Sequence, residues 1–108
     1  MRTLKYSFSY LPFRGNTMPG TRIVYTPGIA ELYREEDLLY FIAKANEIMH
    51  EYPSVELVVF TDEPYPEGLG ETGLEYTVKE NKMPHTVWVK KDRYPGENVL
   101  TILLPEEY

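Results

Sequence analysis

Four carboxylates and one histidine are the side chains of this sequence whose types and spacing come closest to metal chemistry. The carboxylates lie within one ten-residue stretch and the histidine follows soon after it: Asp62, Glu63, Glu67, Glu71 and His85. Clustered carboxylate oxygens suit hard cations, and a cation held in this way can activate water for hydrolysis. The spacing matches neither a calcium-binding loop nor a paired histidine motif. A metal-dependent hydrolase is therefore an alternative hypothesis, and we predict that residues 62–73 bind no metal.

The same stretch contains the glycine pattern of dinucleotide-binding loops without the element that gives the pattern its function. Gly68, Gly70 and Gly73 match G-x-G-x-x-G. In a dinucleotide site the last glycine leads into a helix whose N-terminus receives the pyrophosphate. Here residues 74–78 alternate as a strand does, and the neighbouring carboxylates repel phosphate. We predict a turn-rich loop that binds no nucleotide, and we expect no other cofactor.

Basic and aromatic residues are interleaved near the N-terminus, a combination that suits single-stranded nucleic acid. Residues 1–30 contain four cations and no acidic residue: Arg2, Lys5, Arg14 and Arg22. Nucleic-acid binding through this N-terminal hairpin is our second alternative hypothesis. Two observations disfavour it. The rings of Tyr6, Phe8 and Tyr10 fall on the strand face that should be buried, and the whole chain has a net charge of −6.

Charge is divided unevenly along the chain. Residues 1–30 carry +4, residues 31–80 carry thirteen acidic against three basic residues (−10), and residues 81–108 are neutral. A basic and an acidic surface on one small domain can pair between two copies, and a two-fold dimer makes both contacts at once. We therefore predict a homodimer in which the basic hairpin of one copy meets the acidic surface of the other.

Tyrosine is the most prominent aromatic residue. The chain has ten tyrosines, more than one small core can bury, because a buried phenol needs a hydrogen-bond partner. Surplus tyrosines are typical of protein interfaces. Outside the core periodicity lie Tyr33, Tyr40, Tyr65, Tyr94 and Tyr108. Our leading hypothesis is a non-enzymatic module that binds itself and another protein, with these contact residues: Arg14, Arg22, Tyr33, Tyr40, Tyr65 and Tyr94.

A small set of short elements must position these residues. Apolar residues recur every three or four positions from 34 to 52, which predicts one long amphipathic helix. Acidic residues favour its N-terminal end, and Pro53 ends it. Alternating or continuous apolar runs predict strands. These strands are 4–11, 21–25, 55–61, 74–78, 86–90 and 99–104, the last two joined by a turn at 94–97.

The predicted order is β-β-α-β-β-β-β. It indicates a two-layer α+β fold, in which the single amphipathic helix packs on a mixed, mostly antiparallel sheet. A chain of 108 residues holds one core, so we predict a single domain over residues 1–108. The apolar stripe of the helix, which we predict to contact Leu57, Val59 and the C-terminal strand, consists of Leu38, Ile42, Ala45 and Met49.

Composition favours a soluble protein. No apolar run approaches the roughly 18 residues of a membrane span, and the N-terminus lacks the apolar core of a signal peptide. We expect a cytoplasmic protein without membrane contact. Cysteine is absent, which excludes thiolate nucleophiles, thiolate zinc sites and disulfides. The absence of glutamine and the excess of glutamate, fourteen against three aspartates, are typical of thermophile proteins.

Overall fold

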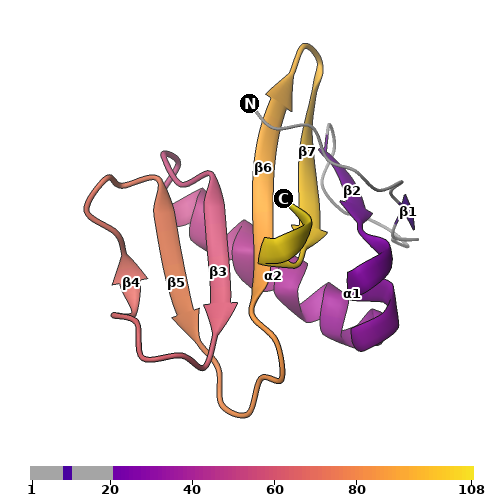
Figure 1. The fold of residues 1–108 in the computed structure, drawn as a ribbon. Helices are drawn as coiled ribbons and strands as arrows, with labels where there is room; N and C mark the ends of the chain where they lie inside the picture. Colours follow the sequence, from indigo (N-terminus) through magenta and orange to yellow (C-terminus); the bar gives the residue numbers. More distant parts are fainter. Residues whose placement is uncertain (1–8, 11–20) are drawn as a thin grey trace.

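The computed structural model describes residues 9–10 and 21–108 and arranges their strands in one seven-stranded sheet (Figure 1). The strands are β1 (Ser9–Tyr10), β2 (Thr21–Tyr25), β3 (Leu57–Thr61), β4 (Gly68–Leu69), β5 (Glu75–Lys79), β6 (Val87–Tyr94) and β7 (Glu97–Leu103). The helices are α1 (Pro27–Leu32), α2 (Glu35–Glu51) and a terminal 3₁₀ helix, η1 (Pro105–Glu107). Most of the predicted strand 4–11, and Arg14 with it, lie outside the described residues.

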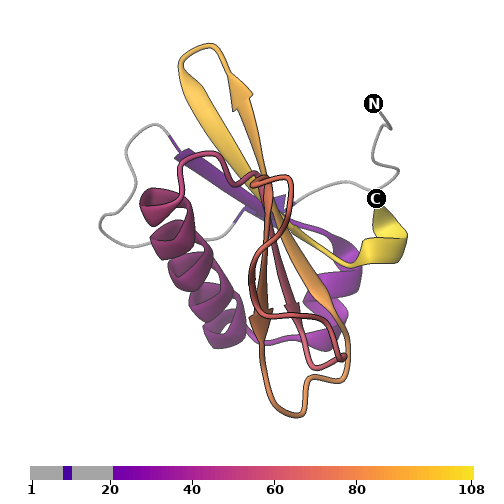
Figure 2. The same ribbon diagram turned by 90° about the vertical axis from the view of Figure 1, so that its left-hand side faces the viewer.

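The sheet is mixed, as predicted. Its strand order is β1-β2-β7-β6-β3-β5-β4. The pairs β2–β7 and β3–β5 are parallel, and the other four pairs are antiparallel. Figure 2 shows α2 on one side of the sheet and η1 on the other. The predicted α+β class, with one main helix on a mixed sheet, is therefore confirmed, while α1, β4 and η1 are additions that the sequence patterns did not predict.

Helix α2 follows the predicted periodicity closely. Its first turn is acidic, and the Asp37 carboxylate accepts a hydrogen bond of 3.1 Å from the backbone N–H of Arg34. This contact satisfies one of the free N–H groups that every helix start exposes. The apolar stripe is buried and consists of Leu38, Phe41, Ile42, Ala45, Ile48 and Met49.

The residues of β3 that pack against α2 differ from those we predicted. Val58 and Phe60 belong to the core under the helix, and the rings of Phe41 and Phe60 lie 4.9 Å apart. Val59 is buried on the other side of the sheet, so the predicted contacts with Leu57 and Val59 are wrong by one residue. Because the run from 57 to 60 is apolar at every position, its pattern does not indicate which side faces the helix. The predicted contact region on the C-terminal strand does join this core, through Leu100 and Ile102.

Helix α1 begins at Pro27-Gly28, a dipeptide that is typical of turns. Thr26 is its N-cap, and the Thr26 hydroxyl accepts from the Ile29 N–H at 3.4 Å. The buried Glu107 carboxylate from η1 accepts hydrogen bonds from the Thr26 hydroxyl, the Gly28 N–H (3.1 Å) and the Leu104 N–H (3.0 Å). A Cβ at position 28 would lie 2.5 Å from Glu107 Oε2, so a larger residue there would displace the carboxylate. Glu107, 79 positions away from Gly28, thus stabilises a helix start at this Pro-Gly pair.

The β6–β7 hairpin confirms the predicted turn. Gly96 has a φ of +83°, a conformation that glycine adopts without strain. Tyr94 and Glu97 are the last residues paired before this turn. In the described part of the chain, no helix has the length and apolar character needed to cross a membrane.

Candidate functional site

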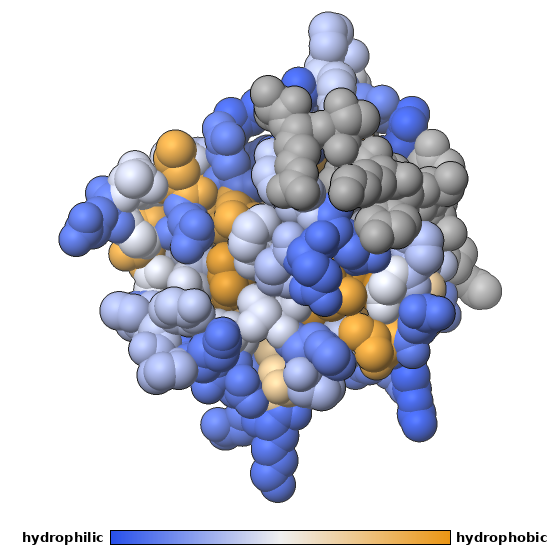
Figure 3. Space-filling model, viewed as in Figure 1, coloured by the Kyte–Doolittle hydropathy of each residue, from blue (hydrophilic) through white to orange (hydrophobic). Residues whose placement is uncertain are grey.

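A groove of about 680 Å³ lies on the sheet face that α2 leaves open. In Figure 3, which views this face, apolar surface is visible over β3, β5 and β4 among hydrophilic side chains. The volume falls within the usual range of ligand clefts. Its lining residues come from β3 to β6, the connecting loops and η1: Val59, Glu63, Tyr65, Pro66, Gly68, Leu69, Gly70, Glu71, Glu75, Thr77, Thr86, Trp88 and Pro105.

The floor of the groove is a row of residues in register across adjacent strands. Val59 is paired with Thr77 on β5 and with Trp88 on β6. Thr77 is in turn paired with Gly68 on β4. Residues opposite one another in a sheet point to the same face, so these side chains form one continuous strip. Their immediate neighbours along each strand, such as Val58, point into the core under α2.

The rim of the groove is acidic. The charged residues in its described lining are three glutamates, Glu63, Glu71 and Glu75, and all three are exposed. Tyr65 and Leu69 add exposed apolar surface, with exposed fractions of 55% and 46%. A rim of this kind attracts cations at its edge while the floor below favours apolar groups.

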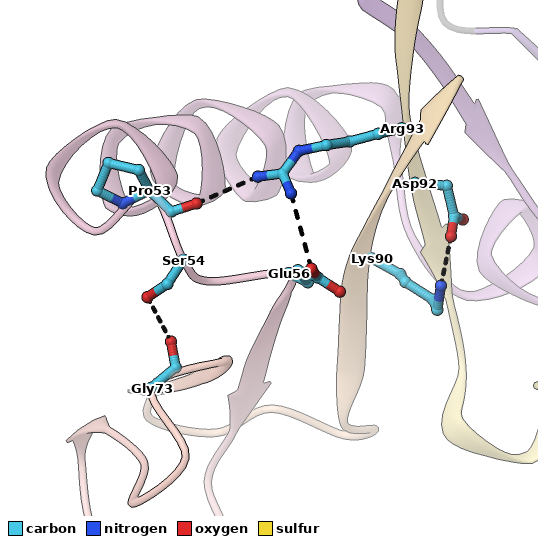
Figure 4. A network of polar contacts seen from close by, with 7 residues as sticks. All are labelled: Pro53, Ser54, Glu56, Gly73, Lys90, Asp92 and Arg93. Atoms are coloured by element: carbon cyan, nitrogen blue, oxygen red, sulfur yellow. Dashed lines mark hydrogen bonds and ion pairs between the residues drawn. The ribbon is translucent and has the colours of Figure 1, made fainter. Parts of the chain in front are cut away.

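The β4–β5 turn, which carries Glu71, is held by hydrogen bonds. The Gly70 N–H donates to the Glu75 carbonyl at 2.8 Å, and the Gly73 N–H donates to the Gly70 carbonyl at 3.0 Å. The Ser54 hydroxyl donates to the Gly73 carbonyl at 2.7 Å, which ties the turn to the end of α2 (Figure 4). After Gly73 the chain continues as β5, so the predicted strand replaces the helix that a dinucleotide loop would need.

An aromatic and cationic group lies beside the floor at Trp88. The ring of Tyr108 is 6.0 Å from the Trp88 ring, and the Lys90 ammonium lies 5.7 Å from the Tyr108 centroid. Lys90 is also paired with Asp92 at 2.6 Å, as Figure 4 shows. Because Asp92 compensates this ammonium, the Lys90–Asp92 pair adds no net positive charge beside the groove.

The predicted contact tyrosines do not gather on one surface. Tyr65 lines the groove, whereas Tyr94 is exposed at the β6–β7 hairpin. Tyr33 donates to the His85 carbonyl at 2.7 Å, and burial raises its pKa. Tyr40 donates to the Glu80 carboxylate, and this hydrogen bond raises the Tyr40 pKa to about 12. The last two phenols therefore anchor the β5–β6 loop to the helical layer.

The predicted basic surface is partly engaged within the chain. Arg22 forms an ion pair with Glu97 of the neighbouring β7, with 3.1 Å between Nη2 and Oε2. Arg14 lies outside the described residues. Arg22 is therefore less available to a partner than its charge alone suggests.

The residues of the metal hypothesis are not assembled into a centre. Glu63 and Glu71 line the groove, Glu67 accepts from the Lys79 N–H at 3.4 Å, and the carbonyl of His85 is engaged by Tyr33. Within residues 9–10 and 21–108, no three His, Cys, Asp or Glu side chains come together as metal ligands. The structure thus brings two members of the set, Glu63 and Glu71, to one groove and leaves Asp62 and His85 out of its lining.

Sequence reasoning missed the floor of the groove. Its central residues are Val59, Thr77 and Trp88, which we did not predict as site residues. A signal was present in the alternation of β5 and β6, where Thr77 and Trp88 fall opposite the positions that pack under α2. The strand order that makes them neighbours was not available from the sequence.

No family model, curated protein sequence or solved structure matches this chain.

Proposed function

We propose that this protein is a non-enzymatic binding module whose groove takes an extended segment of a protein, one that carries basic and apolar side chains. A single observation carries the proposal. The row Thr77–Val59–Trp88 forms an apolar floor, and the charged residues of the described rim are glutamates.

The floor and the rim of the groove contribute to binding in different ways. Burial of apolar surface against Val59 and Trp88 supplies affinity, at roughly 25 cal/mol per Å² before the costs of association. The glutamates set orientation and encounter rate by attracting lysine and arginine side chains. The half-buried Trp88 and the exposed Tyr65 add aromatic rings, whose faces attract cations as well as apolar groups.

The two alternatives find less support in this groove. Asp62 and His85 lie outside the described lining, and no three His, Cys, Asp or Glu side chains of the described residues come together as metal ligands, so a metal-dependent hydrolase lacks its predicted ligand set here. Phosphate groups would approach three glutamates, which opposes nucleic-acid binding at this site.

The test uses the only tryptophan of the chain as its reporter, since Trp88 lies in the groove. The ligand is a seven-residue peptide that alternates valine with lysine or arginine, and its matched control carries glutamate in place of every cation. We expect saturable changes in Trp88 fluorescence with the basic peptide and none with the acidic one. Raising the salt concentration should weaken binding, because exposed charges are screened.

Variants of the rim separate specific binding from general charge attraction. Glu71→Gln with Glu75→Gln should weaken the basic peptide about two- to thirtyfold, since exposed ion pairs contribute about 0.2–1 kcal/mol each. The matched control is Glu47→Gln with Glu51→Gln, which makes the same charge change on α2, in the opposite layer. Equal losses in both variants, or no saturable binding to the native protein, would contradict the proposal.

A further inference from the structure

We infer that the segment bound in the groove is residues 1–8 of a second copy of this chain. This inference rests on the proposed function above and names the occupant of the same groove. It commits to a reciprocal exchange, in which each copy supplies its N-terminal segment to the other.

Chemical complementarity singles out this segment. Residues 1–8 contain two cations, Arg2 and Lys5, and no acidic residue. Their apolar members Leu4, Tyr6 and Phe8 alternate with polar ones, which suits an extended strand lying on an apolar floor. The rim offers Glu71 and Glu75 to the cations.

Topology favours a second copy over the same chain. Ser9 and Tyr10 pair with β2 at one edge of the sheet, five strand positions away from β5. Five steps of about 4.8 Å span about 24 Å. Val59 of the floor lies on β3, four strand positions from β1, or about 19 Å away. Phe8 is adjacent to Ser9, and chain length limits its Cα to about 4 Å from that residue. In its own chain Phe8 therefore falls short of the floor at Val59, whereas a second copy has no such limit.

A two-fold axis makes the exchange self-consistent. An isologous interface repeats every contact, so one exchange brings two segments into two grooves. This arrangement gives the predicted homodimer a specific surface, and it assigns the uneven charge of the chain a role in pairing the copies.

The test is a charge-reversal exchange with full-length chains, read by light scattering at micromolar concentration. One variant carries Arg2→Glu with Lys5→Glu, and the other carries Glu71→Lys with Glu75→Lys. We expect a dimer for the native protein and about tenfold or greater weakening for each variant alone, because like charges then face one another. A mixture of the two variants, or all four changes in one chain, should restore the dimer.

Matched controls carry the same charge changes on α2 or next to it. Arg34→Glu with Lys44→Glu is the control for the first variant, and Glu47→Lys with Glu51→Lys for the second. Neither control should change the dimer. A native protein that stays monomeric, or a mixture that fails to restore the dimer, would overturn the inference.

A synthetic peptide of residues 1–8 distinguishes failure of the inference from failure of the proposed function. It should bind the groove, change Trp88 fluorescence and dissociate the dimer as it competes. If the valine–lysine peptide binds and the 1–8 peptide does not, the occupant is another protein: the inference is wrong and the proposed function stands. If neither peptide binds, both are wrong.

Discussion

The two faces of the sheet differ in how the same strands are used. Under α2, alternate residues of β3, of β5 and of the first half of β6 pack into a core of aliphatic and aromatic side chains. On the open face, the intervening residues Val59, Thr77 and Trp88 form a groove with an acidic rim. The core that stabilises the fold is therefore concentrated on one face, and the recognition we propose lies on the other, because alternation lets one strand contribute to both faces. Mutations that act on one face should leave the other largely unaffected.

The largest effect is expected on the covered face. Ile42 is 1% exposed, so Ile42→Ala removes buried methyl groups and leaves a cavity. The free energy of unfolding should fall by about 2–5 kcal/mol. Chemical denaturation measures this loss, and peptide affinity of the folded fraction should stay unchanged. A loss below about 0.5 kcal/mol would mean that α2 contributes little to the core.

A smaller effect is expected where η1, on the open side, meets the start of α1. Gly28→Ala places a Cβ against the Glu107 carboxylate, and overpacking of this kind costs about 1–3 kcal/mol. Glu107→Gln is a second variant, which replaces the carboxylate that accepts these hydrogen bonds and adds no volume at position 28. If Gly28→Ala is as stable as the native protein in thermal denaturation, the Glu107 contact does not govern the start of α1.

Stability should depend on pH through Tyr40 of α2, which contacts Glu80 just after the end of β5. Tyr40 has a pKa of about 12 in the folded chain against 10.0 for the free side chain, because it donates a hydrogen bond to Glu80. The folded state holds this proton more tightly, so the contribution of Tyr40 to stability is present below pH 10 and is lost as the pH rises toward 12. Tyr40→Phe should reduce the loss of melting temperature between pH 9 and pH 11. An identical pH profile in both proteins would contradict this assignment.

The smallest effect concerns the acidic loop. We expect magnesium, manganese, calcium and chelators to leave the melting temperature unchanged, since a ligand that binds only the folded state would raise it. The four carboxylates of the loop are spread between the groove, a backbone contact and solvent, with Glu67 engaged by the Lys79 N–H. A rise of several degrees with any of these ions would revive the hydrolase hypothesis.

Local patterns in the sequence were sufficient for most of the fold. The stripe from Leu38 to Met49 has the period of a helix, and the Pro95-Gly96 pair predicts the turn between β6 and β7. These features depend on residues a few positions apart, so the sequence specifies them directly. The α+β class follows, because one apolar helix face needs a sheet to cover it.

Tertiary structure decided the features that depend on distant residues. The side of β3 that faces α2 was ambiguous, since residues 57–60 are all apolar. Helix α1 begins at Pro27-Gly28 because Glu107 accepts hydrogen bonds there. The groove exists because the strand order places Thr77, Val59 and Trp88 side by side. Short-range periodicity carries no information on such pairings, which form only when strands that are distant in the chain hydrogen-bond to one another.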